Sequence, residues 1–268
     1  MGCGIRSQTV YRMRLMFDVM SDTRCNAETA MKRVHFEVSE TAVTIIAGDE
    51  YVKVAKDAVF EARSIIEHKI SDDPFFQITY DPYPVSERDD VLIQRMCKAS
   101  LTANVGPMAA VAGAVATYAV ERMRDAGAVY AIVENGGDIA LFSDRPVTIG
   151  LYSGDSKLNM LSVIIPASEN ITGVCSSSGK VGPSVSFGNS NISTVFSNDV
   201  ILADAVATRL GNLTGMMKLS EAVEVAGSLK GVKGCIAYSD GMMAMFGDVP
   251  ELIKSNVPED KITKIILQ

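Results

Sequence analysis

The chain has 268 residues, 47% hydrophobic and 21% charged, so it can form a sizeable globular core and is not disordered, collagen-like or a coiled coil. Its net charge of -7 argues against a surface that follows the phosphates of DNA or RNA. Its five cysteines form no CxxC pair, which indicates reduced thiols in a cytosol rather than a disulfide framework or a zinc site.

A strand hairpin followed by a long helix is predicted for the first part of the chain. Apolar and polar residues alternate over 34–38, and a second apolar run covers 42–47. Apolar residues then recur at helical spacing over 51–70. Residues 71–86 hold three prolines and are predicted to form a loop.

Two more helices are predicted over 89–100 and from Pro107 onward, since proline suits the first position of a helix. Both faces of the second helix are small and apolar, so it should be packed on more than one side. Gly113 weakens it by about 1 kcal/mol relative to alanine, which predicts a close backbone contact there. The apolar part, 108–120, is mostly alanine and too short to span a bilayer.

The remaining elements predict the fold class. Strands are expected over 128–134, 138–142, 147–152, 160–166, 191–196, 235–238 and 243–246, and helices over 202–212 and 219–229. Because strand and helix blocks are segregated rather than alternating, we predict an α+β fold. No linker or internal repeat divides the chain, so a single domain over 1–268 is expected.

The N-terminal residues do not predict a targeting segment. Arg6, Arg12 and Arg14 interrupt what a signal peptide requires as an apolar core. We therefore expect a cytoplasmic protein without a membrane or nucleic-acid partner.

Two adjacent glycines form the first candidate site. Asn135, Gly136, Gly137 and Asp138 lie between two predicted strands, and Asn-Gly is the strongest short-range signal for a hairpin turn. The local sequence favours that turn. The alternative is that the glycine pair lets the backbone approach a nucleotide.

A Gly/Ser-rich stretch is the second candidate site. It is not a GxxxxGK[ST] phosphate-binding loop, because five residues separate Gly173 from Gly179. Ser176, Ser177, Ser178 and Gly179 nevertheless offer hydroxyls and backbone N–H groups that suit an anion. A polar loop without a ligand is the competing interpretation.

Cys175 heads this stretch and is the best thiol candidate of the five cysteines. A nucleophilic role requires a base or cation nearby, and Lys180 is the one charged neighbour in sequence. Lone cysteines are more commonly small buried hydrophobes.

Asp204 and Thr208 are a candidate pair of metal ligands. Their i, i+4 spacing places both on one helix face, where a carboxylate and a hydroxyl suit a hard cation such as Mg²⁺. Alternatively, Asp204 complements the dipole at the helix N-terminus and Thr208 bonds back to its own turn.

The chain has two histidines, and both are predicted to be exposed rather than catalytic. His35 occupies the polar phase of a strand, and His68 lies near a helix end. Most of the chain must therefore carry out any acid–base chemistry without histidine.

Four segments occur in an order that resembles a known family. They are NVGPMAAVAGA, VENGGDI, GVCSSSG and LADAVAT, and the resemblance covers about residues 30 to 250. Together they resemble the ApbE-like family, distant relatives of the ApbE flavin transferases. The resemblance implies an ApbE-type α+β fold, often assembled as a homodimer.

The resemblance also implies a ligand site. ApbE enzymes bind FAD and Mg²⁺ and transfer FMN to a threonine of a target protein. By that likeness Gly136, Gly137 and Asp138 would line the nucleotide site, and Asp204 and Thr208 would hold the metal.

Two departures from the ApbE pattern affect the expected chemistry. ApbE enzymes carry Lys-Gly where this chain has Ala112 and Gly113, and the family commonly has a histidine where Pro183 stands. Without a group that activates the threonine hydroxyl, transfer is not expected. We therefore predict a protein that binds FAD, FMN or a related nucleotide, with Mg²⁺, but lacks conventional FMN-transferase activity.

The resemblance carries an alternative as well. Family members in methanogenic archaea are linked to sulfur incorporation during homocysteine formation, and Cys175 would suit such a role. A scaffold that uses the site only for assembly is a third possibility.

Overall fold

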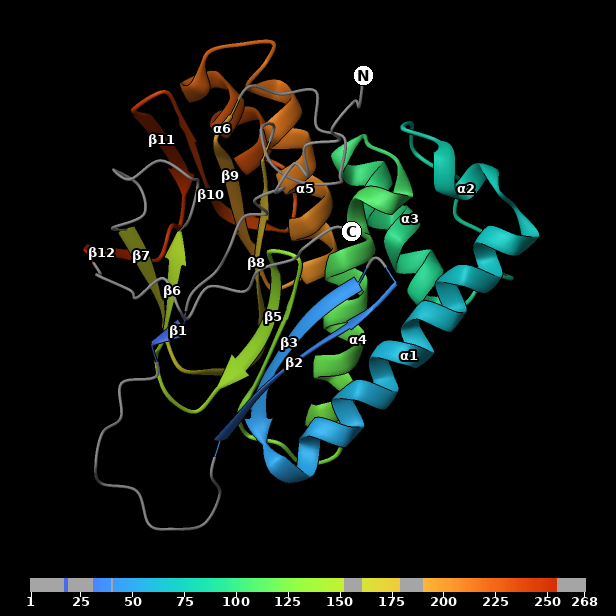
Figure 1. The fold of residues 1–268 in the computed structure, drawn as a ribbon. Coiled ribbons are helices and arrows are strands. Elements are labelled where there is room, and N and C mark those ends of the chain that lie inside the picture. Colours follow the sequence, from blue (N-terminus) through green and yellow to red (C-terminus); the bar gives the residue numbers. More distant parts are fainter. Residues whose placement is uncertain (1–16, 19–30, 40, 152–160, 179–189, 255–268) are drawn as a thin grey trace, which may run out of the picture.

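The computed structural model describes residues 17–18, 31–39, 41–151, 161–178 and 190–254 (Figure 1). The strands are β1 (Phe17–Asp18), β2 (Met31–Val38), β3 (Thr41–Gly48), β4 (Ala131–Asn135), β5 (Asp138–Ser143), β6 (Val147–Leu151), β7 (Leu161–Ile165), β8 (Ser168–Ser177), β9 (Ile192–Ser197), β10 (Val232–Ser239), β11 (Met242–Gly247) and β12 (Glu251–Lys254). The helices are α1 (Asp49–Asp72), α2 (Phe75–Ile78), α3 (Val91–Ala103), the 3-10 helix η1 (Pro107–Ala110), α4 (Val111–Asp125), α5 (Val200–Leu213) and α6 (Leu219–Gly227).

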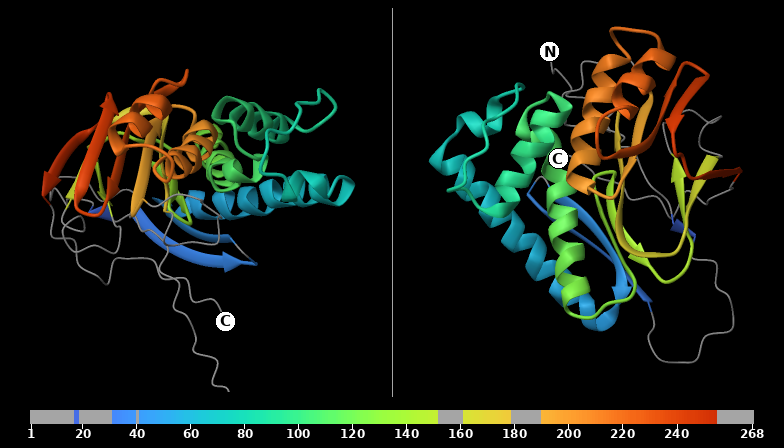
Figure 2. Two further views of the ribbon diagram at one scale, coloured as in Figure 1. Left: turned by 90° about the horizontal axis from the view of Figure 1, so that it is seen from above. Right: turned by 180° about the vertical axis from the view of Figure 1, so that it is seen from behind.

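An eight-stranded sheet is the middle layer of the fold. Its strand order is β11-β10-β9-β8-β5-β4-β3-β2, and a second sheet has the order β1-β6-β7-β12. The helices pack on one face of the large sheet and the small sheet packs on the other, as Figures 1 and 2 show. All described strand pairings are antiparallel. The predicted α+β class is therefore confirmed.

Strand alternation decides which side chains face the helices. Successive side chains of a strand point to opposite faces of its sheet. On β8, Val174 belongs to the core between the two sheets, whereas Cys175 belongs to the helix-side core. On β5, Ile139 likewise belongs to the core between the two sheets and Ala140 to the helix-side core. Asp138, two residues before Ala140, is therefore on the face of the sheet that the helices cover.

Several boundaries differ from the sequence prediction. Pro107 begins η1 rather than α4, and α2 lies inside the predicted loop 71–86. The largest difference is β8, which extends to Ser177 where a polar loop was predicted. Pairing with β9 buries its serines, and the sequence pattern of β8 by itself does not reveal that partner.

No single described helix is long and apolar enough to cross a membrane. Helix α3 and the segment η1–α4 reach that length and composition only as a pair, and the pair is bent by 106°.

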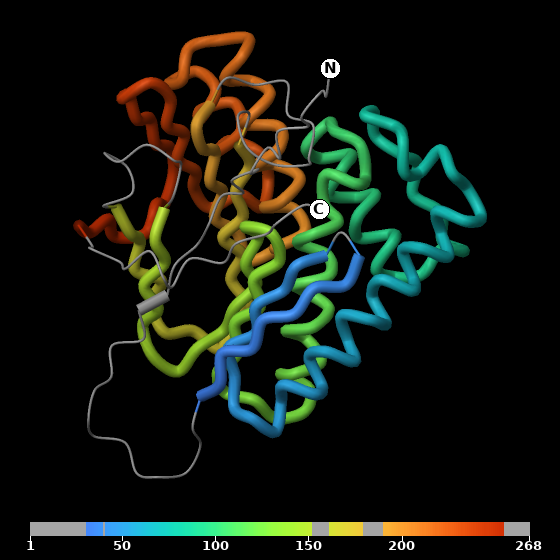
Figure 3. The backbone as a smooth tube through the Cα atoms, in the orientation of Figure 1, coloured from blue at the N-terminus to red at the C-terminus, as the bar shows by residue number. Residues whose placement is uncertain are grey.

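Helices α1 and α4 run side by side along the large sheet, and α5 packs against α4 (Figure 3). At the crossing of α4 and α5, Gly113 faces Val200 and Asp204. A Cβ at position 113 would lie 2.8 Å from the Val200 carbonyl oxygen and 2.8 Å from the Asp204 Cβ. The predicted close backbone contact at Gly113 is therefore present.

Replacing Gly113 with alanine tests this contact. Helix propensity alone predicts a stabilisation of about 1 kcal/mol. The clash at 2.8 Å with backbone should outweigh it, since overpacking costs about 1–3 kcal/mol. We expect a lower free energy of unfolding in urea for Gly113→Ala. A variant more stable than the wild type would contradict the packing of α4 on α5.

Candidate functional site

Four elements bring separate sequence motifs together at one end of the helix-side core. The Gly113 N–H at the start of α4 donates to Asp204 Oδ2 of α5 over 2.7 Å. The Ser176 N–H of β8 donates to Asp138 Oδ1 of β5 over 3.2 Å. The side chains of Asp138 and Asp204 in turn share a hydrogen bond. The glycine-pair, serine and Asp204 motifs therefore form one cluster.

The segment between β4 and β5 is the tight hairpin that the local sequence predicted. Gly136 and Gly137 have φ values of 63° and 108°, and positive φ at both turn positions is the requirement for the favoured two-residue hairpin. Asn135 and Asp138 are opposite each other on the two strands. The Asn135 amide donates to the Ala112 carbonyl over 3.2 Å, which links the turn to α4. The hairpin and the candidate site are thus the same structure.

Asp138 and Asp204 form a buried pair of carboxyl groups. Two carboxyl groups can hydrogen-bond to each other only when one of them holds a proton. Burial raises the pKa of Asp204 to about 7, against the opposing effect of hydrogen bonds from the Gly113 and Ala112 N–H groups and from Asp138. None of these contributions comes from a lysine or arginine. The pair therefore keeps a proton to near neutral pH.

Hydroxyl groups of β8 and β9 pair on both faces of the large sheet. Ser177 and Ser193 share the helix-side face with Cys175, whereas Ser176 and Thr194 lie with Val174 on the face toward the small sheet. The Ser176 hydroxyl donates to Thr194 over 2.8 Å. Ser177 is opposite Ser193, whose hydroxyl lies 3.0 Å from that of Ser190. The Ser177 Oγ is buried and has no hydrogen-bond partner among the described residues. A buried hydroxyl without a hydrogen-bond partner is uncommon, so the Ser177 hydroxyl is a candidate for a hydrogen bond to a ligand or to water.

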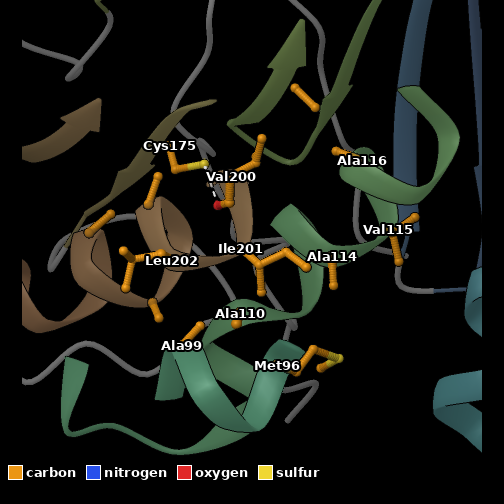
Figure 4. Close-up of a cluster of buried hydrophobic side chains, with 14 of the residues drawn as sticks. Met96, Ala99, Ala110, Ala114, Val115, Ala116, Cys175, Val200, Ile201 and Leu202 are labelled. Carbon is orange, nitrogen blue, oxygen red and sulfur yellow. Dashed lines mark hydrogen bonds between the residues drawn. The ribbon is translucent and has the colours of Figure 1, made fainter. Parts of the chain in front are cut away.

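Cys175 lies in the helix-side core next to the carboxyl pair. Its thiol is fully buried and donates to the Val200 carbonyl over 3.5 Å, as Figure 4 shows. Burial raises the pKa of Cys175 well above its ordinary value, and the charges of Asp138 and Asp204 raise it further. The thiol is therefore neutral, and no cation is among the groups that shift its pKa.

The second proposed metal ligand, Thr208, lies one turn along α5 from Asp204 and is half-buried. Its hydroxyl makes no hydrogen bond to another described residue, so the alternative of a back-bond to its own turn is not formed within that part of the chain. Asp204 does not complement the helix N-terminus either. Asp199 is the N-cap and accepts from the Leu202 N–H over 3.2 Å. Gly179, Lys180 and Pro183 lie outside the described residues, as does any contact they make.

Both histidines lie away from the site, as predicted. His35 on β2 is exposed and hydrogen-bonds through Nδ1 to Thr44 of β3 over 3.1 Å. His68 in α1 is exposed and pairs with Asp72 over 3.5 Å. Because the chain has only these two, no histidine takes part in the cluster around Asp138.

Some residues of the site were not identified from the sequence. Ser193 of β9 lies opposite Ser177, and its hydroxyl contacts that of Ser190. Thr194 pairs with Ser176 on the other face of the sheet. The available signal was the polar pair Ser193–Thr194 inside an otherwise apolar strand. Asn135 was named as a turn residue, but its bond to Ala112 depends on how α4 packs against β4.

Comparison with known proteins identifies the family. A family model described as "AbpE bacteria" matches residues 23–226. A UPF0280 protein of Methanosarcina acetivorans is 46% identical over 235 residues, which cover 86% of this chain and 92% of that protein. The chain belongs to the UPF0280 family. Another UPF0280 protein, from Archaeoglobus fulgidus, is 42% identical over 240 residues, 87% of this chain and the full length of its own.

The fold of this UPF0280 protein is similar to that of solved flavin transferases. The flavin transferase ApbE from Vibrio cholerae superposes with a TM-score of 0.55 and 11% identity, covering 82% of this chain and 97% of that one. The flavinyl transferase ApbE from Pseudomonas stutzeri, in its apo form, superposes with a TM-score of 0.53 and 10% sequence identity. The match covers 83% of this chain and 96% of that one. At this level of identity the likeness concerns the fold, and it confirms the ApbE-type architecture that the motifs implied.

The carboxyl pair should make the stability of the protein depend on pH. The pKa of Asp204 is raised in the folded state to about 7, so folding takes up a proton that the unfolded chain releases above about pH 4. The free energy of unfolding should therefore fall as the pH rises from 5 to 8. Asp204→Asn, which donates to Asp138 without titrating, should lose this contribution.

Urea unfolding of both proteins at pH 5, 6, 7 and 8, with EDTA present, measures the effect. The stability of Asp204→Asn relative to the wild type should increase with pH, by an amount on the order of 1–3 kcal/mol. A difference that stays constant between pH 5 and 8 would show that the pair holds no extra proton.

Cys175 should be unreactive in the native protein. Because its thiol is neutral and enclosed, iodoacetamide at pH 8 is expected to leave the Cys175 peptide unmodified, whereas the same peptide should react fully in guanidinium chloride. Peptide mass spectrometry reports both states. Rapid native labelling of Cys175 would contradict this environment.

Proposed function

We propose that this protein binds a flavin or a closely related nucleotide together with Mg²⁺, at the cluster formed by Asp138, Asp204, the glycine pair and the β8 serines. The observation that carries the proposal is the buried pair of carboxyl groups, in which Asp204 accepts from the Gly113 N–H and Asp138 accepts from the Ser176 N–H. Such a pair favours a divalent cation, because the cation can replace the shared proton and compensate both charges.

The donor set fits Mg²⁺ only together with a nucleotide. Among the described residues, no group of three or more His, Cys, Asp and Glu side chains could enclose a metal ion. Mg²⁺ in proteins is commonly held by one or two carboxylates, and substrate phosphates and water complete its octahedron. Asp138 and Asp204 would supply the carboxylates, with Thr208 as a further oxygen. The metal would neutralise phosphate charge and orient the nucleotide.

The polar groups around the carboxyl pair suit the nucleotide itself, as distinct from the Mg²⁺ that would accompany it. The unpartnered Ser177 hydroxyl offers a donor and an acceptor. The turn at Gly136 and Gly137 has no side chains, so a ligand can approach its backbone closely. The overall likeness to ApbE flavin transferases supports a flavin as the nucleotide, although that activity belongs to those proteins.

Transfer of FMN is not part of the proposal. The reaction requires a base for the accepting threonine hydroxyl, and His35 and His68 are both engaged elsewhere on β2 and α1. The Asp138–Asp204 pair keeps a proton near neutral pH, and a metal bound there would occupy its oxygens. We therefore propose a binding protein that retains the site without the usual transfer chemistry.

The alternative role in sulfur incorporation has less support. It requires Cys175 to act as an accessible thiolate. The thiol is instead buried and donates to the Val200 carbonyl, and its pKa is raised by burial, so it stays protonated. In a sulfide-dependent homocysteine assay, Cys175→Ser should leave the activity unchanged. Loss of activity in that variant would restore the sulfur role.

Calorimetric titration with FAD, FMN and ADP, each with and without Mg²⁺, tests the proposed ligand. We expect at least one to bind, with an affinity increased at least about tenfold by Mg²⁺, because the metal joins the nucleotide phosphates to both carboxylates. Mg²⁺ alone should bind weakly. Absence of binding by all three nucleotides would refute the proposal.

Variants identify the site. Asp204→Asn should remove the Mg²⁺-dependent part of the affinity, whereas Asp72→Asn, which removes an exposed carboxylate at the end of α1, should not. Since protons compete with the metal for the pair, the effect of Mg²⁺ should be larger at pH 8 than at pH 6. If both variants lose the Mg²⁺-dependent affinity equally, the loss reflects the net charge of the protein and not a metal site at Asp204.

A further inference from the structure

An open polar cavity on the surface lies beyond the N-terminal end of α5. Its volume is about 230 Å³, and its walls come from α3, α4, the start of β8 and Asn198, which precedes α5. Arg124 lies on α4 about 16 Å along the helix axis from Gly113, so the guanidinium end of this cavity is distant from the Asp138–Asp204 site. Thr117, at the other end of the cavity, is one helical turn from Gly113.

The lining of the cavity is rich in hydrogen-bond donors. Arg95 of α3 pairs with Glu121 of α4 over 2.9 Å, and this pair leaves further guanidinium N–H groups of Arg95 free to donate. Arg124 is exposed, and its guanidinium has no hydrogen-bond or ion-pair partner among the described residues. The side-chain amides of Asn170 and Asn198 likewise make no hydrogen bond to another described residue.

The charge of the cavity is positive in a chain whose net charge is -7. The side chains that line the cavity include two arginines and one glutamate, so the lining itself carries one net positive charge. The Asp199 carboxylate, next to Asn198 in sequence, remains charged, but it accepts from the Leu202 N–H at the N-terminus of α5 and is not among the side chains that line the cavity. Two guanidinium groups and two amides around one space form a donor set typical of oxyanion recognition.

The size of the cavity restricts the ligand. Pockets for drug-sized molecules and cofactors occupy about 300–1,000 Å³. At about 230 Å³ this cavity is smaller than that range and would not enclose a dinucleotide. Buried Ile171 and Thr117 contribute to its walls, and the Thr117 hydroxyl is already used by the Gly113 carbonyl. Binding specificity must therefore come from the arginines, the amides and Glu121.

From this arrangement we propose that the cavity binds a small metabolite with one oxyanion group, either a phosphate ester or a carboxylate. Arg124 and Arg95 bind the oxyanion, and Asn170 and Asn198 donate to it. The free lone pairs of Glu121 accept from a hydroxyl or amine of the same molecule. Arg124, the exposed guanidinium of this site, lies at the end of the cavity away from the proposed nucleotide site.

The test is calorimetric titration of the full chain with inorganic phosphate and, separately, with malonate, in a low-chloride buffer. We expect a Kd of about 1 mM or tighter for at least one of them. Binding of phosphate alone assigns the site to phosphate esters, and binding of malonate alone assigns it to carboxylates. If neither binds, the proposal is wrong.

Two variants and one control locate the binding. Arg124→Gln should weaken binding at least about tenfold, as expected for loss of a charge-assisted hydrogen bond, and should leave the fold intact because Arg124 is exposed. Glu121→Gln should strengthen it, because it removes a repulsive charge while the amide oxygen still accepts from Arg95. Arg88→Gln removes an exposed arginine outside the cavity and should have no effect.

The two sites are distinguished by their ligands. Arg124→Gln should bind FAD, FMN and ADP as the wild type does, so failure of one proposal leaves the other standing. An anion affinity that is the same in Arg124→Gln and the wild type would overturn the assignment of this cavity, even if phosphate binds elsewhere.

Discussion

The hydrogen bond from the Gly113 N–H to Asp204 is the constraint on which the rest of the site depends. It forms only because α4 approaches α5 so closely that no side chain fits between them at position 113. The same approach removes Asp204 from water and holds it beside Asp138, which leads to the shared proton. A packing contact between two helices therefore determines the protonation state of the site.

Local patterns were enough to predict most elements of this fold. The spacing of apolar residues located α1, α3 and α5, and Asn-Gly located the β4–β5 turn. The Gly/Ser stretch was misjudged because its polar composition is typical of a loop. It continues as β8 because β9 presents Thr194 and Ser193 opposite Ser176 and Ser177, and such pairing depends on residues distant in sequence.

The site was only partly predictable for the same reason. The order of four motifs grouped Asp138, Ser176 and Asp204, which lie close together in the structure, but it did not reveal that the two carboxyl groups are hydrogen-bonded. The proximity of the two carboxyl groups depends on which face of the sheet Asp138 occupies on β5 and on how α4 crosses α5. Neither can be read from the local sequence. Cys175 was singled out because it adjoins the serines, yet strand alternation turns it into the core.

The partners Gly113 and Asp204 are 91 residues apart in the chain, and Asp138 and Ser176 are 38 apart. Contacts between such distant segments form only after the large loops between them have closed, and they do not survive local unfolding of one segment. The site is thus assembled by the same cooperative transition that builds the central sheet. A ligand held there would stabilise the central sheet and its helices together against unfolding, and its free energy of binding would be distributed over β5, β8, α4 and α5.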